Sequence, residues 1–314
     1  MKWAPLYGLL AGMLLEPSVN AATPLTLPSE NRIQPSSLEL ERKTEPWCPA
    51  DCAVAVPFVA SYQKGRERLV FVGVRHAFNP HDPTMRAVAA GFTMILPNVV
   101  IVEGFPTAMG ENPPPLVEEA RRNGTPNADE FARMEPMFAA SIALKRGIPF
   151  VGGEPTEDED IRLLKEKGFT EAEIAFSSLA GWYSQALRSG EIPDTSFESL
   201  TKTYPRLAQK VRDQTHLEPP PLNEFRQQYR QLYGVDIVGD RQFVLRTDIR
   251  DTTRHGQQGT VSMMTRDRHL LGLIEQQLAD RQSVLVVYGG SHWATLSEAL
   301  EERLGKPTVR PFLK

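Results

Sequence analysis

The sequence lacks an excess of positive charge. Its 35 lysines and arginines stand against 39 aspartates and glutamates, which gives a formal net charge of −4 over 314 residues. A broad basic field is the usual electrostatic footprint of proteins that bind nucleic acid or anionic membranes. The basic residues here are scattered, so we expect neither nucleic acid nor an anionic membrane surface as the main partner.

Several short motifs with a known chemistry are also missing. The chain has no P-loop, no complete dinucleotide-binding fingerprint, no H-E-x-x-H and no C-x-x-C-H haem attachment motif. The segment "GGSHW" lacks the central serine of a Gly-x-Ser-x-Gly elbow, which argues against an α/β-hydrolase serine nucleophile. The chemistry of this chain must therefore be sought in other residues.

Long apolar runs are scarce, and the one at the N-terminus is too short to span a membrane. Lys2 precedes an apolar stretch over residues 3–15, and Val19-Asn20-Ala21 has the small residues of a cleavage site. A spanning helix needs about 20 apolar residues. We therefore expect residues 1–21 to be a signal peptide, with a periplasmic or secreted mature chain that has no stable membrane span.

Cysteine is nearly absent. Cys48 and Cys52 are the only two, in the pattern C-x-x-x-C. In the oxidising compartment that a signal peptide implies, so close a pair is more typical of a structural disulfide than of a thiol site. A redox or metal-binding role of this pair is the weaker alternative.

The rest of the sequence favours an α/β fold. With 41% hydrophobic residues, a chain of this length can bury a sizeable core. Strand and helix patterns alternate up to about residue 155, which predicts right-handed crossovers and a mostly parallel or mixed central sheet flanked by helices. Helical periodicity then dominates at about 157–259, which we interpret as a large helical insertion. The predicted organisation is a signal peptide at 1–21, a flexible leader at 22–46 and one α/β domain at 47–314.

Four of the predicted strands end in a glycine beside an ionisable residue. They are "FVGVRH" (His76), "IVEG" (Glu103), "FVGGEP" (Glu154) and "VYGGSH" (His292). If the strands are parallel, these ends share one edge of the sheet, where open α/β folds bind their ligands. The glycines allow sharp turns and a close approach of the backbone to a ligand.

Two imidazoles and one or two carboxylates at one edge suit a first-row divalent metal, or a general base with an electrostatic partner. Each residue also has a structural alternative, because glycine at a turn is ordinary and a histidine there often caps a helix. We favour a functional role for His76, His292 and Glu103. Glu154 has the equal alternative of capping a helix that begins near Glu157.

An arginine near the same edge is a further candidate. Arg266 and Asp267 lie on a predicted helix whose apolar face would dock on the sheet. Arg266 could hold a carboxylate or stabilise a developing oxyanion. Arg75 and Arg268 are alternatives for this role.

These motifs, in their order, resemble the Tiki/TraB/GumN superfamily, which also includes ChaN-like haem-binding proteins and erythromycin esterases. The segments that carry the resemblance are "GVRH", "VVIVEG", "TRDRHLLGLI" and "VYGGSH", within roughly residues 68–104 and 262–304. The matching positions are His76, Glu103, Arg266 with Asp267, and His292. The sequence departs from the peptidase members by Asp267, where those commonly have asparagine, and by its long helical insertion.

The resemblance implies three different activities. Tiki and TraB relatives imply a metal-dependent peptidase, with manganese or cobalt in Tiki proteins. Erythromycin-esterase relatives imply metal-free hydrolysis with a histidine base. ChaN-like relatives imply haem-iron binding without catalysis.

Our main hypothesis is an exported metal-dependent hydrolase, peptidase-like, that acts on a peptide or small-molecule substrate. His76, His292, Glu103 and Glu154 would hold a divalent metal (manganese, cobalt or zinc), and Arg266 would stabilise the anionic intermediate. The first alternative is a metal-free hydrolase with a histidine base, which an arginine favours because it would repel a divalent cation. The second is a haem or iron carrier. The sequence leaves the oligomeric state open.

Overall fold

The computed structural model describes residues 56–75, 77, 79–123, 135–188, 191–240, 242–243 and 253–312. The predicted signal peptide, the leader, the Cys48–Cys52 disulfide and His76 lie outside these described residues.

A mixed six-stranded sheet forms the centre of the α/β part, in the order β4-β3-β5-β2-β1-β6. β2 is parallel to β5, β5 to β3, and β3 to β4, whereas β1 is antiparallel to β2 and β6 is antiparallel to β1. The strands are β1 (Phe58–Lys64), β2 (Glu67–Val74), β3 (Val99–Pro106), β4 (Phe150–Glu154), β5 (Ser283–Gly289) and β6 (Thr308–Pro311). The prediction of a mostly parallel or mixed sheet flanked by helices is confirmed.

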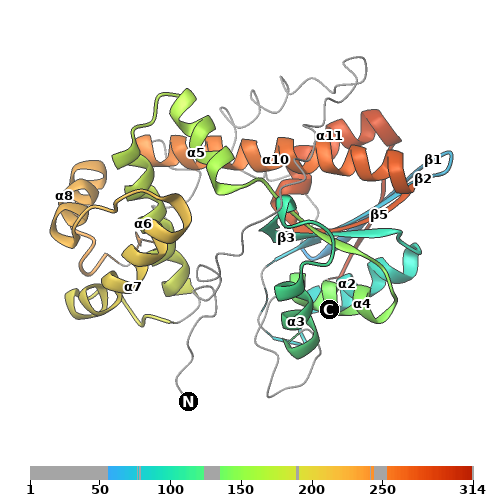
Figure 1. Cartoon of the computed structure of the whole chain (residues 1–314), viewed down its shortest axis with the longest axis horizontal. Helices are drawn as coiled ribbons and strands as arrows, with labels where there is room; N and C mark the ends of the chain where they lie inside the picture. Colours follow the sequence, from blue (N-terminus) through green and yellow to red (C-terminus); the bar gives the residue numbers. More distant parts are fainter. Residues whose placement is uncertain are drawn as a thin grey trace, which may run out of the picture. The chain divides into compact units, whose positions relative to one another are not determined.

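Helices cover both faces of this sheet (Figure 1). On one face lie α2 (Pro83–Met94), α3 (Pro114–Asn123) and α4 (Glu135–Lys145), whose buried side chains share a core with β2, β3 and β5. On the other face lie α11 (Gly290–Leu304) and the later part of α10 (Arg254–Arg281). Because both faces are covered, β5 is buried along its whole length, and its sequence "SVLVVYG" is a continuous apolar run rather than an alternating one.

The chain divides into two compact units. Among the described residues, one unit holds 161–261 and the other holds those up to 160 and from 262 onward. The first unit is helical, and its bounds are close to the insertion predicted at about 157–259. It contains α6 (Glu171–Arg188), α7 (Phe197–Thr215), α8 (Leu222–Tyr233) and most of α5 (Glu157–Glu166).

The helical unit has a core of its own. Tyr183 stacks on Phe225 with ring centroids 5.6 Å apart, and both side chains are fully buried. At the start of α6, the Thr170 hydroxyl accepts from the Glu173 N–H and the Glu173 carboxylate accepts from the Thr170 N–H. This reciprocal capping box defines where the helix begins.

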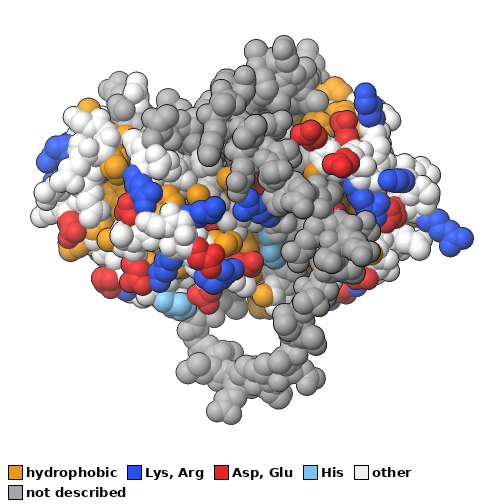
Figure 2. Space-filling model, turned by 90° about the horizontal axis from the view of Figure 1, so that it is seen from above, with side chains coloured by type: hydrophobic (Ala, Val, Ile, Leu, Met, Phe, Trp, Pro, Cys, Tyr) orange, Lys and Arg blue, Asp and Glu red, His pale blue; other side chains and the backbone are white. Residues whose placement is uncertain are grey.

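The described surface carries charges of both signs, interspersed with one another on the face shown in Figure 2. Within the described parts of the chain, no helix is both long enough and apolar enough to cross a membrane.

Two of the glycines near the strand ends are required by packing. A Cβ on Gly73 would lie 2.2 Å from the Phe58 ring, and a Cβ on Gly152 would lie 2.1 Å from the Phe105 carbonyl oxygen. Neither has a positive φ, whereas Gly104, two residues before the end of β3, does, at 89°. The turning role expected from the sequence thus applies to Gly104, and close packing explains Gly73 and Gly152.

We predict that Gly152→Ala lowers the free energy of unfolding by about 3 kcal/mol, because overpacking against a backbone carbonyl cannot be relieved by a rotamer change. Urea denaturation measures this. The matched control is Gly272→Ala, inside α10, where a Cβ meets nothing within 4 Å. That change should raise the free energy of unfolding by about 0.5–1 kcal/mol. Equal stabilities of the two variants would contradict this account of β4.

Candidate functional site

The predicted convergence of strand ends is found in the structure. Because β2, β5, β3 and β4 are parallel neighbours, their carboxyl ends lie at one edge of the sheet. Glu103 comes from β3, Glu154 from the last position of β4, and His292 from the first turn of α11, directly after β5. His76 follows β2 in the sequence but lies outside the described residues.

Arg266 of α10 connects two of these strand ends. Its Nε donates to Glu154 Oε2 at 2.7 Å and its Nη2 donates to Glu154 Oε1 at 2.6 Å, which is a bidentate pair. The same Nη2 donates to Glu103 Oε1 at 2.8 Å. The side chains of Glu103 and Glu154 are 8% and 13% exposed, and that of Arg266 is 28% exposed. Arg266 is therefore the arginine that reaches this edge and holds its carboxylates.

Backbone N–H groups engage the same carboxylates. Gly289 at the end of β5 donates to Glu103 Oε2 at 2.7 Å, and Gly104 donates to Glu154 Oε1 at 3.0 Å. Both oxygens of each glutamate are thus engaged. The cap of α5 is instead Thr156, whose hydroxyl accepts from the Glu159 N–H at 3.3 Å. Thr156, and not Glu154, therefore caps this helix.

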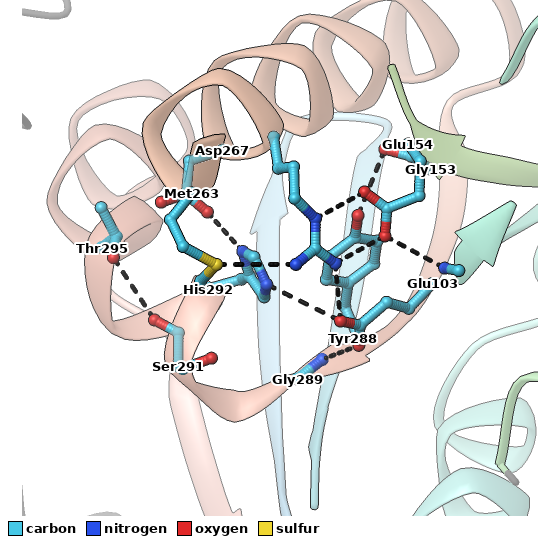
Figure 3. Close-up of polar contacts among 12 residues, drawn as sticks. Glu103, Gly153, Glu154, Met263, Asp267, Tyr288, Gly289, Ser291, His292 and Thr295 are labelled. Carbon is cyan, nitrogen blue, oxygen red and sulfur yellow. Dashed lines mark hydrogen bonds and ion pairs between the residues drawn. The ribbon is translucent and has the colours of Figure 1, made fainter. Parts of the chain in front are cut away.

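His292 is paired with Asp267, which the sequence did not place beside this histidine. His292 Nδ1 lies 2.5 Å from Asp267 Oδ1, and these side chains are 2% and 1% exposed (Figure 3). A carboxylate can only accept, so the proton of the neutral imidazole lies on Nδ1. The lone pair of Nε2 is then available, and Nε2 lies 3.7 Å from Glu103 Oε1, too far for a hydrogen bond.

Tyr288 packs beneath these groups. Its ring meets the His292 ring edge-on with centroids 4.8 Å apart, and the Arg266 guanidinium lies 5.9 Å from its centroid. Its hydroxyl donates to the Gly153 carbonyl at 3.3 Å. Burial raises the pKa of Tyr288 well above its ordinary value. Tyr288 thus stays neutral and acts as a rigid wall of the site.

The pKa values of Glu154 and Arg266 follow from their pairing. Burial alone would raise the pKa of Glu154, but the Arg266 charge and the hydrogen bonds to the carboxylate together outweigh it and lower that pKa to about 2. Burial alone would lower the pKa of Arg266, but the charge and the hydrogen bond of Glu154, with smaller effects of Tyr288 and Glu103, together outweigh it and raise that pKa well above its ordinary value. Both groups are therefore charged at neutral pH.

A divalent metal fits the described residues poorly. Across the described ranges, no group of three His, Cys, Asp or Glu side chains is arranged to hold a metal ion. Arg266 and backbone donors already engage Glu103 and Glu154, which were two of the four predicted ligands. His292 Nε2 and Glu103 Oε1 lie 3.7 Å apart.

Sequence reasoning missed the roles of Asp267 and Tyr288 in this site. Asp267 directly follows Arg266, and successive residues on a helix do not share a face. Nothing in the spacing indicates that Arg266 reaches β3 and β4 while Asp267 reaches α11. Tyr288 precedes "GGSH" directly, and its position inside an apolar strand is typical of core packing.

We predict that Glu154→Gln lowers the free energy of unfolding at pH 7, with a pH dependence that identifies the charge pair. The pKa of Glu154 falls from 4.5 to about 2 on folding, which corresponds to about 3 kcal/mol. Because the folded-state pKa is depressed, this stabilisation is fully present above pH 4.5 and is lost as the pH falls toward 2. Urea denaturation of both proteins across this range should show the difference closing.

The control for this measurement is Glu218→Gln. Glu218 also pairs with an arginine, Arg212, but its side chain is 73% exposed, so solvent screens the interaction. Its removal should barely change stability at any pH. A difference for Glu154→Gln that stays constant from pH 7 to pH 2 would contradict the electrostatic account.

Comparisons of the chain with protein-family models, with curated proteins and with solved structures give no match. The resemblance to the Tiki/TraB/GumN superfamily therefore stays a prediction, and the geometry of the site carries the functional argument.

Proposed function

We propose that this chain is an exported hydrolase of the Tiki/TraB/GumN type in which His292 is a general base that works without a metal. The observation that carries the proposal is the buried His292–Asp267 pair, with 2.5 Å between Nδ1 and Oδ1. This was the first alternative from the sequence, and the pairing of Arg266 with both glutamates now favours it over the metal-dependent form.

His292 would take a proton from water at Nε2. Asp267 accepts the hydrogen bond from the Nδ1–H group. It thereby sets the tautomer of the imidazole and would stabilise the imidazolium that forms. Glu103 Oε1 lies 3.7 Å from Nε2, so one water molecule can be within hydrogen-bond reach of both. The water then attacks the carbonyl carbon of an ester or amide in a peptide or small-molecule substrate.

Arg266 would stabilise the negative charge of the resulting intermediate. Its Nε and Nη2 hold the glutamates, while its Nη1 lies 3.5 Å from the sulfur of Met263, a weak acceptor (Figure 3). The Nη1 protons are thus the ones available to an oxyanion. The two glutamates keep the guanidinium in one orientation before the substrate arrives.

A metal-dependent hydrolase is the second candidate, and one observation favours it. A carboxylate on Nδ1 that leaves Nε2 free is also the arrangement found around metal-ligating histidines. His292 and Glu103 would hold the ion, with His76 as the further predicted ligand. When bound, manganese, cobalt or zinc would supply an activated water nucleophile. Arg266 argues against this candidate, because its positively charged guanidinium already donates a hydrogen bond to the same Glu103 oxygen.

We expect His292→Gln and Asp267→Asn to lower kcat on the order of 10²–10⁴-fold, the usual contribution of a positioned general base. The measurement is hydrolysis of a panel of ester and peptide substrates by the mature chain, 22–314. The control is His216→Asn, because His216 is an exposed C-cap of α7 in the left-handed region that asparagine tolerates.

Chelation separates the two candidates. Activity that survives exhaustive chelation supports the metal-free base, and activity lost and then restored by manganese, cobalt or zinc supports the metal-dependent form. Unchanged hydrolysis by folded His292→Gln would reject both. A haem absorption band lost with the histidines would indicate the carrier instead.

A further inference from the structure

Met263 places a thioether sulfur directly against the Arg266 guanidinium. It lies on α10 three positions before Arg266, and residues with this spacing are neighbours on one face of a helix. Its sulfur accepts a hydrogen bond from Arg266 Nη1 at 3.5 Å (Figure 3). The mechanism above uses the Nη1 protons and gives the sulfur no task.

The sulfur is the weakest of the acceptors that surround this guanidinium. Nε and Nη2 donate to the carboxylates of Glu154 and Glu103 at 2.6 to 2.8 Å. Nη1 donates to a thioether, which competes poorly with an anion for a hydrogen bond. The availability of Nη1 to a substrate therefore depends on which acceptor the side chain at position 263 presents.

Oxidation would replace this acceptor by a strong one. Methionine takes up one oxygen atom to form the sulfoxide, which turns an apolar side chain into a polar one. A sulfoxide oxygen carries partial negative charge, so its hydrogen bond from the guanidinium would be charge-assisted. The methionine side chain has three rotatable bonds, which let the sulfur withdraw and make room for the added oxygen. That oxygen would then take the place of the substrate oxyanion on Nη1.

The sulfur also lies where a small oxidant can reach it. Met263 is partly exposed, and the side chain of Arg266 beside it is 28% exposed. Met85 and Met137, by contrast, are core residues with 3% exposure. Met264 is partly exposed too, but residues two positions apart on a helix do not face each other, so its sulfur is not directed to Arg266.

We propose that Met263 is a site of oxidation by hydroperoxides, and that its sulfoxide switches the site off by binding Arg266 Nη1. The sulfur attacks one peroxide oxygen, so that an S–O bond forms and the O–O bond breaks. The proton of the attacked oxygen passes to the other oxygen, which leaves as water, or as an alcohol from an organic hydroperoxide. The sulfur is thereby oxidised and the peroxide reduced. Methionine sulfoxide reductases reverse the change.

The loss of activity rests on the proposed function, in which Nη1 stabilises an oxyanion, whereas the binding of Nη1 by the sulfoxide can be tested without a substrate. The mature chain is treated with hydrogen peroxide, and tandem mass spectrometry locates the added oxygen. We expect the NMR signals of the Arg266 guanidinium to shift in the oxidised protein and to return after treatment with the reductases. In Met263→Leu, which keeps the apolar bulk without the sulfur, peroxide should not shift them.

Activity gives the second readout, with each protein compared with its own untreated sample. We expect peroxide to lower kcat on the order of 10²–10³-fold, the usual cost of one lost oxyanion donor, and the reductases to restore it. Met263→Leu should keep its kcat through the treatment. The matched control is Met94→Leu, because Met94 is a 39% exposed methionine at the end of α2. This variant should respond to peroxide as the unaltered chain does.

Three results would overturn the inference: a Met263 that stays reduced, a sulfoxide at Met263 with unmoved Arg266 signals, or an equal loss of activity in Met263→Leu. Reversible shifts of the Arg266 signals in a protein that hydrolyses nothing would support the binding of Nη1 by the sulfoxide and reject the proposed function. Reversible shifts with undiminished hydrolysis would reject the switch.

Discussion

The ion-pair cluster around Arg266 is the interaction on which the rest of the site depends. One guanidinium from α10 binds the ends of β3 and β4 through Glu103 and Glu154, and Glu103 in turn accepts from Gly289 at the end of β5. Removing one partner of a buried pair typically costs about 3–5 kcal/mol, because the other charge is left uncompensated. The cluster therefore ties α10 to three strands of the parallel part of the sheet, and this fixes where Asp267 lies.

The position of Asp267 follows from that tie. With Arg266 bound to the strand ends, the next residue on α10 is directed to His292 at the start of α11. An asparagine in this place could also accept a hydrogen bond from Nδ1 through its amide oxygen. Aspartate differs in that its negative charge would stabilise the imidazolium of the proposed base. The aspartate at position 267 thus supports the histidine base proposed above.

Sequence reasoning located the sheet edge correctly, and physical reasons explain what it missed. Parallel strands with crossovers bring their carboxyl ends together, so the strand pattern alone was enough to group Glu103, Glu154 and His292. The contact of Asp267 could not be inferred in this way, because it depends on how α10 is rotated on the sheet. A small rotation of the helix about its axis changes which polar side chains meet. The apolar periodicity of the sequence does not fix that rotation closely enough. The glycines illustrate the same limit, since Gly152 is required by the neighbouring Phe105 carbonyl, which no local pattern contains.

The distinction between the two hydrolytic candidates reduces to a competition for one oxygen. Glu103 Oε1 accepts from Arg266 Nη2 at 2.8 Å and lies 3.7 Å from His292 Nε2. A divalent ion held by His292 and Glu103 would share Glu103 with the guanidinium, and in a partly buried site the repulsion between two cations is screened far less than in water. Binding of the ion would therefore oppose the hydrogen bond from Arg266 to Glu103. That hydrogen bond favours catalysis by the histidine base.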